Sequence, residues 1–229
     1  MIDFSYVLWV MLPGLLLSGW ASMKTRSAFN KYSKVRSMNG YTGAQAAQQL
    51  LRRAGITDVR VQPTRGFLSD HYNPMTKTLA LSEAVYASPS IAAVGVACHE
   101  AGHAIQHARS YKPLWLRSAL VPTAGIGSNL GVYAMMFGLF IGQWLVLVGA
   151  LLFSAVVLFQ LVTLPVEFDA SRRAKVLAVQ NGVVQPQERA GMDKVLDAAA
   201  MTYIAAAISS ILTLLYFLFR SGLLGGRRD

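Results

Sequence analysis

The feature that most constrains this chain is a long stretch without a single charged side chain. No Asp, Glu, Lys, Arg or His lies between Arg117 and Glu167, and none lies between Asp197 and Arg220. A third apolar stretch covers residues 4–23. Because a bilayer core requires about 20 apolar residues per helix, the first gap is long enough for two crossings and each of the others for one. The pattern predicts a mainly α integral membrane protein with four transmembrane helices.

The predicted spans divide the chain into five segments. Residues 1–23 are an N-terminal transmembrane anchor, and residues 118–164 are a transmembrane hairpin with crossings at 120–140 and 144–164. Residues 201–229 hold the last crossing, at 201–219, and a tail. Residues 24–117 and 165–200 are polar segments. The first apolar stretch is expected to be a retained anchor and not a cleaved signal peptide, because its basic residues follow it and only Asp3 precedes it.

The distribution of positive charge predicts the orientation. Eighteen of the 21 Lys and Arg residues lie in the two polar segments, and the others are Arg220, Arg227 and Arg228. By the positive-inside rule, the polar segments are cytoplasmic and the N-terminus is outside. The same rule accounts for the net charge of +10 without a nucleic-acid partner. Anionic lipid head groups are the expected partner of the basic cluster from Lys24 to Arg36.

The two polar segments predict a small α+β element. An amphipathic helix is expected at residues 42–54, where Thr42 is a suitable N-cap and Gly55 a suitable stop. Short strands are expected at residues 59–62 and 78–82, with a turn at residues 70–74 between them. A longer helix is expected from just after Ser90 to near Ser110. In the second polar segment, Pro165 is expected to end the third crossing, before helices at 167–178 and at 187–200, the latter continuing into the fourth crossing.

One short run carries the chemistry. Residues 99–103 read His-Glu-Ala-Gly-His and fall in the helix expected after Ser90. Residues four apart on a helix share a face, so His99 and His103 can bind one metal ion. Glu100 can reach a water on the same ion and act as its general base. The motif indicates metal-assisted hydrolysis, most often of peptide bonds.

A catalytic zinc site needs three protein ligands and one position for water, so a third ligand must come from elsewhere. The position six residues after His103 is Arg109, which excludes the three-histidine metzincin arrangement. A carboxylate on a later helix is the alternative, and Glu167 and Asp169 are the candidates. Because the chain crosses the bilayer and returns, both re-emerge on the side of the motif helix. A carboxylate at the end of a membrane helix is a functional candidate, since it is costly there without a partner.

Two motifs together resemble a known family. The runs His-Glu-Ala-Gly-His-Ala-Ile-Gln at residues 99–106 and Pro-Val-Glu-Phe-Asp-Ala-Ser-Arg-Arg-Ala at residues 165–174 are similar to those of the YugP-type membrane zinc metallopeptidases, the bacterial neutral zinc metallopeptidase family. Parts of residues 70–82 and 194–203 extend the resemblance over nearly the whole chain. It implies a gluzincin-like site with one Zn²⁺ ion, a catalytic Glu100, and three ligands, which are His99, His103 and Glu167.

Other residues near these motifs are expected to support the ligands. The wider gluzincin pattern has an aspartate four residues after the third ligand, where this chain has Ser171. A serine can hydrogen-bond a ligand histidine but brings no charge to it. Asp169 could take over that role, or even the ligand role, although the motif position favours Glu167 as the ligand. His107 lies one turn beyond His103 and is expected to support the site or face solvent, and not to bind the ion.

Substrate contacts are expected from the strand at residues 78–82. Zincins commonly hold an extended peptide by strand addition, and the middle of this strand is formed by Leu79, Ala80 and Leu81. An oxyanion stabiliser is also needed. The candidates for it are His71, Tyr72 and Tyr203.

The sequence therefore predicts four transmembrane helices and a small cytoplasmic zincin-like α+β element that contains the H-E-x-x-H helix. The predicted function is hydrolysis of peptide bonds in a peptide or membrane-protein substrate at the cytoplasmic membrane face. A non-catalytic, zinc-stabilised scaffold that binds a membrane partner is the alternative. An ion transporter is disfavoured, because ionisable groups are missing from the middle of every predicted crossing. The sequence indicates no particular oligomeric state.

Overall fold

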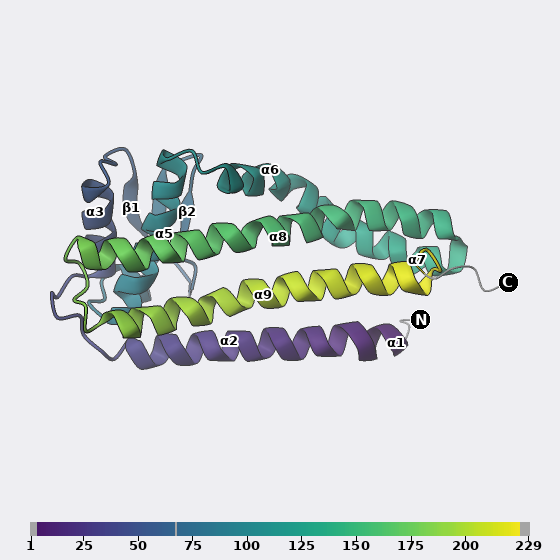
Figure 1. Ribbon diagram of the computed structural model, residues 1–229, viewed down its shortest axis with the longest axis horizontal. Helices are drawn as coiled ribbons and strands as arrows, with labels where there is room; N and C mark the ends of the chain where they lie inside the picture. Colours follow the sequence, from purple (N-terminus) through teal and green to yellow (C-terminus); the bar gives the residue numbers. More distant parts are fainter. Residues whose placement is uncertain (1–3, 67, 225–229) are drawn as a thin grey trace. The chain divides into compact units, whose positions relative to one another are not determined.

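The computed structural model describes residues 4–66 and 68–224 (Figure 1). Of these, residues 4–20, 115–164 and 202–224 form one compact unit, here called the membrane unit. Residues 21–66, 68–114 and 165–201 form a second, here called the polar unit. The predicted divisions at residues 23, 117, 164 and 200 fall within three residues of these boundaries. Asp3, Arg227 and Arg228, which entered the predicted orientation, lie outside the described residues.

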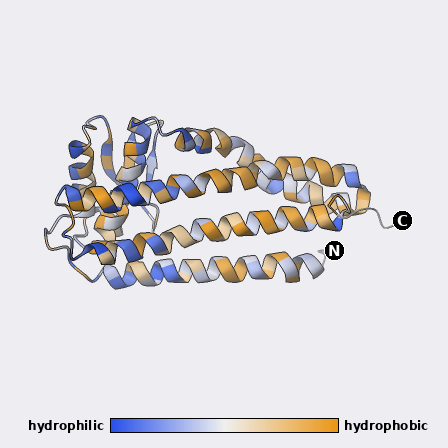
Figure 2. Ribbon diagram, in the orientation of Figure 1, coloured by the Kyte–Doolittle hydropathy of each residue, from blue (hydrophilic) through white to orange (hydrophobic). Residues whose placement is uncertain are grey.

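Four helical stretches are long and apolar enough to cross a membrane, as predicted. Figure 2 shows hydrophobic residues along their parts in the membrane unit, while most of the hydrophilic residues lie on elements of the polar unit. Four of the helices, α2, α6, α8 and α9, run without interruption from one unit into the other. The elements of these four stretches, in which η denotes a π-helical segment, are α1 (Phe4–Tyr6), η1 (Val7–Met11), α2 (Leu12–Tyr32), α6 (Lys112–Ile126), η2 (Gly127–Gly131), α7 (Val132–Ile141), α8 (Gln143–Gln180) and α9 (Arg189–Arg220).

Two helix boundaries differ from the predictions, and both involve proline. The second span begins at Lys112 and not near residue 120, because Pro113 lies in its first turn, where a missing N–H costs no helical hydrogen bond. The predicted crossing at 144–164 and the predicted helix at 167–178 are parts of one helix, since α8 continues for fifteen residues beyond Pro165, to Gln180. After the proline, the small side chains of Ala170 and Ala174 are fully buried. Packing in the polar unit therefore maintains the helix that the proline alone would end.

The polar unit contains the predicted helices with their predicted caps. It comprises α3 (Gly43–Arg53), β1 (Arg60–Thr64), β2 (His71–Asn73), β3 (Thr78–Ser82), α4 (Glu83–Tyr86) and α5 (Ile91–Ala108), together with the ends of α2, α8 and α9. Thr42 and Gln45 form a reciprocal capping box at the start of α3. The Ser90 hydroxyl accepts a hydrogen bond from the Ala93 N–H and begins α5. These side chains confirm the predicted starts of both helices.

The three strands form one sheet in the order β1-β3-β2. Strand β3 is parallel to β1 and antiparallel to β2, and every residue of β3 is buried. The segment at residues 71–73 was expected to belong to a turn, but it pairs with Thr78–Ala80 as the edge strand β2. The turn comes later, where the Asn73 side-chain oxygen accepts the N–H groups of Met75 and Thr76. A three-residue strand gives too little alternation to be recognised from sequence.

Helix α5 runs through the core of the polar unit and approaches α8 closely. Gly102 makes this possible, because a Cβ there would lie 2.6 Å from the backbone oxygen of Ala170. Ala170 is one helical turn after Glu167 on α8. The close approach therefore brings Glu167 beside the turn of α5 that carries the two histidines.

We predict that Gly102→Ala destabilises the protein, because the new methyl group would collide with backbone that cannot move aside. Overpacking of this kind costs about 1–3 kcal/mol. Gly95→Ala is the matched control in the same helix, since its Cβ would come closest to the flexible Met192 side chain, at 3.2 Å, and would meet the Met192 backbone only at an ordinary contact distance of 3.9 Å. Both variants gain the same helix propensity, about 1 kcal/mol. Thermal unfolding of the detergent-solubilised proteins should show a lower midpoint for Gly102→Ala than for Gly95→Ala, and equal midpoints would contradict the prediction.

Candidate metal centre

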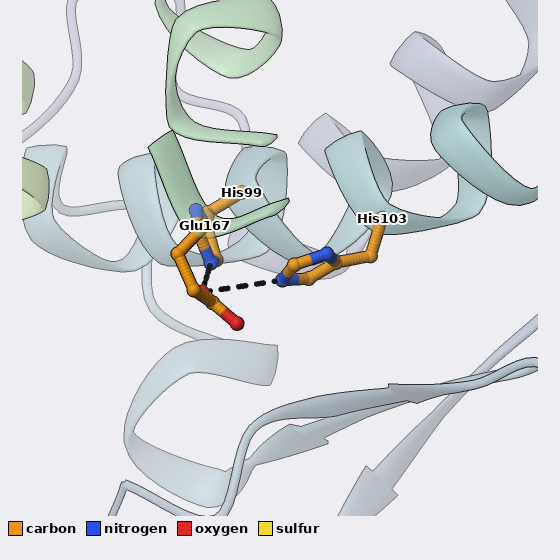
Figure 3. A group of neighbouring side chains, drawn as sticks. All are labelled: His99, His103 and Glu167. Atoms are coloured by element: carbon orange, nitrogen blue, oxygen red, sulfur yellow. Dashed lines mark hydrogen bonds and ion pairs between the residues drawn. The ribbon is translucent and has the colours of Figure 1, made fainter. Parts of the chain in front are cut away.

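Three side chains from two helices converge in the polar unit (Figure 3). His99 and His103 project from the same side of α5, and each directs its Nε2 atom to one carboxylate oxygen of Glu167 on α8. The two nitrogen-to-oxygen distances are 3.2 Å and 3.5 Å. One ligand atom from each of the three residues lies within 4.8 Å of the other two. The structure therefore brings together the three residues that the sequence singled out.

The spacing and chemistry of these atoms suit a metal ion. Two ligands held about 2.0–2.1 Å from a tetrahedral zinc ion are about 3.3–3.4 Å apart, and the observed distances lie on either side of that value. An N–H···O hydrogen bond is usually shorter, at about 2.9–3.0 Å. Two imidazoles and one carboxylate are also a ligand set of catalytic zinc sites, which leave a fourth position open for water. His99, His103 and Glu167 could thus hold a zinc ion.

Each histidine is held from behind by a different polar group. The Nδ1 atom of His99 lies 3.0 Å from the Ser171 hydroxyl oxygen on α8, where the sequence analysis expected a supporting contact. The Nδ1 atom of His103 lies 3.1 Å from the side-chain oxygen of Gln106, one turn further along α5. Sequence analysis did not identify Gln106. The sequence signal that could have identified Gln106 is its polar side chain, which follows the apolar Ala104 and Ile105 directly after the second histidine.

Asp169 lies outside the three-residue cluster. Its carboxylate accepts a hydrogen bond from the Gln106 side-chain nitrogen at 2.9 Å and forms ion pairs with Arg172 and Arg173. The structure thus groups Glu167, and not Asp169, with the histidines. Asp169 takes part in the network behind His103. The supporting role that the sequence analysis considered for Asp169 stays a prediction.

Glu100 is almost completely buried next to the cluster. Burial raises the pKa of its carboxyl group to about 7, and the nearby charges of Glu167 and Asp70 act in the same direction, while His99 opposes them. A carboxylate with a raised pKa is a better proton acceptor than an exposed one. Asp70, which the sequence analysis did not single out, accepts hydrogen bonds from the backbone N–H and hydroxyl of Ser82 and so ties the start of β2 to the end of β3.

The predicted substrate strand is not available for pairing. Strand β3 lies between β1 and β2, so its Leu79, Ala80 and Leu81 are buried and cannot add an extended peptide. That prediction is wrong, because it did not anticipate that β2 covers the edge. Strand β2 is itself an edge strand of the sheet and contacts α5.

The structure distributes the remaining candidates as follows. His71 is exposed on β2, and its Nδ1 atom lies 2.8 Å from the Ser69 carbonyl oxygen. The Tyr72 hydroxyl lies 2.8 Å from Nδ1 of His107, so these two residues hold β2 against the end of α5. Tyr203 belongs to the membrane unit, and its role as oxyanion stabiliser stays a prediction.

The structure thus combines four helical stretches that could cross a membrane with a cluster of two histidines and a carboxylate that could hold a metal ion. A family model described as "putative neutral zinc metallopeptidase" matches residues 7–222. The chain is also 47% identical, over 207 residues, to the "putative membrane protease YugP" of Bacillus subtilis (strain 168), covering 90% of this chain and 92% of the relative. No solved structure matches the chain. The chain belongs to the neutral zinc metallopeptidase family.

We predict that Glu167→Ala weakens zinc binding far more than Asp169→Asn does. Removing a ligand leaves two, whereas Asp169→Asn keeps all three and changes a group that contacts no ligand directly. Its loss should therefore stay below the roughly 10- to 100-fold that follows the loss of a direct supporting partner. Competition with a chromophoric chelator measures both affinities in the purified, detergent-solubilised protein. A larger loss in Asp169→Asn than in Glu167→Ala would reverse the assignment of the third ligand.

Proposed function

We propose that this protein is a zinc-dependent endopeptidase. The observation that carries the proposal is the convergence of Glu167 on α8 with His99 and His103 on α5, at distances that suit one zinc ion. The neutral zinc metallopeptidase family supports the same conclusion. The name of the Bacillus relative describes a membrane protease, which favours a peptide or membrane-protein substrate for this chain as well.

Peptide hydrolysis at this site would require a zinc ion and the Glu100 carboxylate. A zinc ion bound at this site would lower the pKa of a water molecule and polarise the scissile carbonyl. Glu100 follows His99 directly in α5, is shielded from solvent, and would accept the proton from that water. It would later deliver the proton to the leaving amine.

The edge of β2 that faces away from β3 is the proposed position for the substrate backbone. It is an edge strand that contacts α5, and its first residue, His71, is close enough to Glu100 to influence the pKa of that carboxyl group. An extended peptide could add to this edge through main-chain hydrogen bonds. His71 and Tyr72 are the residues of β2 proposed to contact the substrate or the oxyanion.

The proposed site of action is the cytoplasmic face of a bacterial inner membrane. Most Lys and Arg residues lie in the polar unit and its flanking helix ends, and the positive-inside rule places such segments in the cytoplasm. Glu167 follows shortly after the apolar part of α8 along the same continuous helix. The chain connectivity therefore favours a site close to the membrane surface.

Glu100→Gln tests the peptidase directly. We expect this variant to keep about one zinc ion per chain and to lose peptide hydrolysis by about 10²- to 10⁴-fold, because the amide cannot accept the water proton. The assay is cleavage of unstructured fluorogenic peptides by the solubilised protein, with zinc content measured by elemental analysis. Glu83→Gln, on the exposed surface of α4, is the matched control and should keep full activity.

The same experiment separates the peptidase from a zinc-stabilised scaffold. A scaffold predicts that Glu100→Gln is silent in every assay, while His103→Ala loses both zinc and stability. Full hydrolysis by the Glu100→Gln variant would refute the peptidase proposal.

Labelling of single introduced cysteines tests the orientation. We expect Ser33→Cys and Gln187→Cys to react only after the membrane is permeabilised, and Leu224→Cys to react with an impermeant maleimide in intact cells. The unmodified protein is the control, because its only cysteine, Cys98, is buried in the core of the polar unit. Labelling of Ser33→Cys from outside the cell would overturn the topology.

A further inference from the structure

Gln106 is a fully buried polar residue in the centre of the polar unit. Its side-chain oxygen lies 3.1 Å from Nδ1 of His103. Its side-chain nitrogen donates one hydrogen bond to the Val166 carbonyl oxygen at 2.8 Å and one to the Asp169 carboxylate at 2.9 Å. These three partners are a candidate ligand, His103, and the residues one position before and two positions after the candidate ligand Glu167.

The partners of Gln106 determine which way its amide group faces. A carbonyl oxygen and a carboxylate can only accept hydrogen bonds, so the NH₂ group must face Val166 and Asp169. The amide oxygen must then face His103, where it can only accept. His103 therefore carries its proton on Nδ1, and its Nε2 lone pair points to the cluster with Glu167.

Asp169 fixes the amide from the other side. It is buried, and Arg172 and Arg173 supply the opposite charge that keeps a carboxylate stable there. Arg173 is itself largely covered and lies over the ring of Tyr111, just beyond the end of α5. The Asp169 charge on α8 thus reaches Nδ1 of His103 on α5 through the Gln106 side chain.

We propose that Gln106 is a positioning residue for the zinc site, which relays the Asp169 carboxylate to His103 and so holds the imidazole in the tautomer and orientation that bind the ion. The two histidines are then supported differently, His99 by the neutral Ser171 hydroxyl and His103 by an amide backed by a charge. The proposal depends on the zinc site put forward above, but it does not depend on peptide hydrolysis.

Gln106→Met tests the relay, because methionine keeps the length and volume of the side chain and removes both hydrogen-bonding groups. We expect zinc affinity to fall by about 10- to 100-fold, the usual effect of losing a supporting partner of a ligand. Gln48→Met on α3, the same exchange outside the cluster, should leave the affinity unchanged. Chelator competition with zinc alone measures both variants.

A double-mutant cycle with Asp169→Asn separates a relay from two independent effects. If Asp169 acts on His103 through Gln106, Asp169→Asn weakens zinc binding in the unmodified protein and has no further effect in the Gln106→Met protein. If the fold losses in zinc affinity of the two single variants multiply in the double variant, the relay is overturned. An unchanged zinc affinity in Gln106→Met would overturn it as well.

The visible absorption of the cobalt(II)-loaded protein gives a readout that a merely structural role would not change. Gln106→Met should alter the spectrum of folded, fully loaded protein, because the His103 ring is no longer held. If Gln106→Met does not accumulate, Asp169→Asn alone should shift the cobalt spectrum, whereas Asp58→Asn, on the exposed surface, should not. An unshifted spectrum in Asp169→Asn would then overturn the proposal.

These outcomes also distinguish this inference from the proposed function. An unmodified protein that binds no zinc would refute the metal site and the peptidase together. Zinc binding that is tight and equal in the unmodified protein and Gln106→Met would refute the role of Gln106 alone.

Discussion

The contact between α5 and α8 is the constraint on which the candidate site depends. Gly102 has no side chain, and this lets the backbone of α8 at Ala170 come within the distance that a methyl group would occupy. The same approach places Glu167 opposite His99 and His103. Because one ligand comes from one helix and two from the other, a shift of either helix by a fraction of a helical turn would separate the three ligand atoms. The close packing at Gly102 and the placement of the candidate metal ligands therefore depend on the same contact between α5 and α8.

The polar groups at this interface are buried in a largely apolar core, and each is matched to a partner. Burying a carboxylate or an imidazole without a partner is costly, so such groups remain stable only in a connected network. Glu167 faces both histidines, His99 faces Ser171, and His103 faces Gln106. Asp169 and its arginines complete the network on the side away from the ligands. The order of the site therefore comes both from contacts among the candidate ligands and from side chains outside the ligand set.

How much of this could be read from the sequence differs from element to element. The four spans were predictable, because a folded chain seldom lacks charge over about twenty residues unless the segment crosses a membrane. The starts of α3 and α5 were predictable from Thr42 and Ser90, since capping is a local interaction. The pairing of His99 with His103 followed from helical spacing alone.

The remaining features depend on contacts between distant parts of the chain. Pro165 would end an isolated helix, but burial of Ala170 and Ala174 maintains α8 beyond it. Strand β2 has only three residues and is specified by its pairing with β3. The role of Gln106 depends on Val166 and Asp169, sixty residues later or more, which no local pattern indicates. Short sequence motifs could identify the candidate metal ligands, but not Gln106, which orients one of them through long-range contacts.

The shortness of β2 has a consequence for how a substrate would be selected. Three residues of strand extend about 10 Å and can offer only two or three main-chain hydrogen bonds, each contributing about 0.5–1.5 kcal/mol. Such an edge would hold a freely diffusing peptide weakly, whatever its sequence. A polypeptide anchored in the same bilayer would meet the edge at a much higher effective concentration than one in solution. For a peptidase built in this way, attachment of the substrate to the same membrane would affect its selection more than the sequence around the cleaved bond.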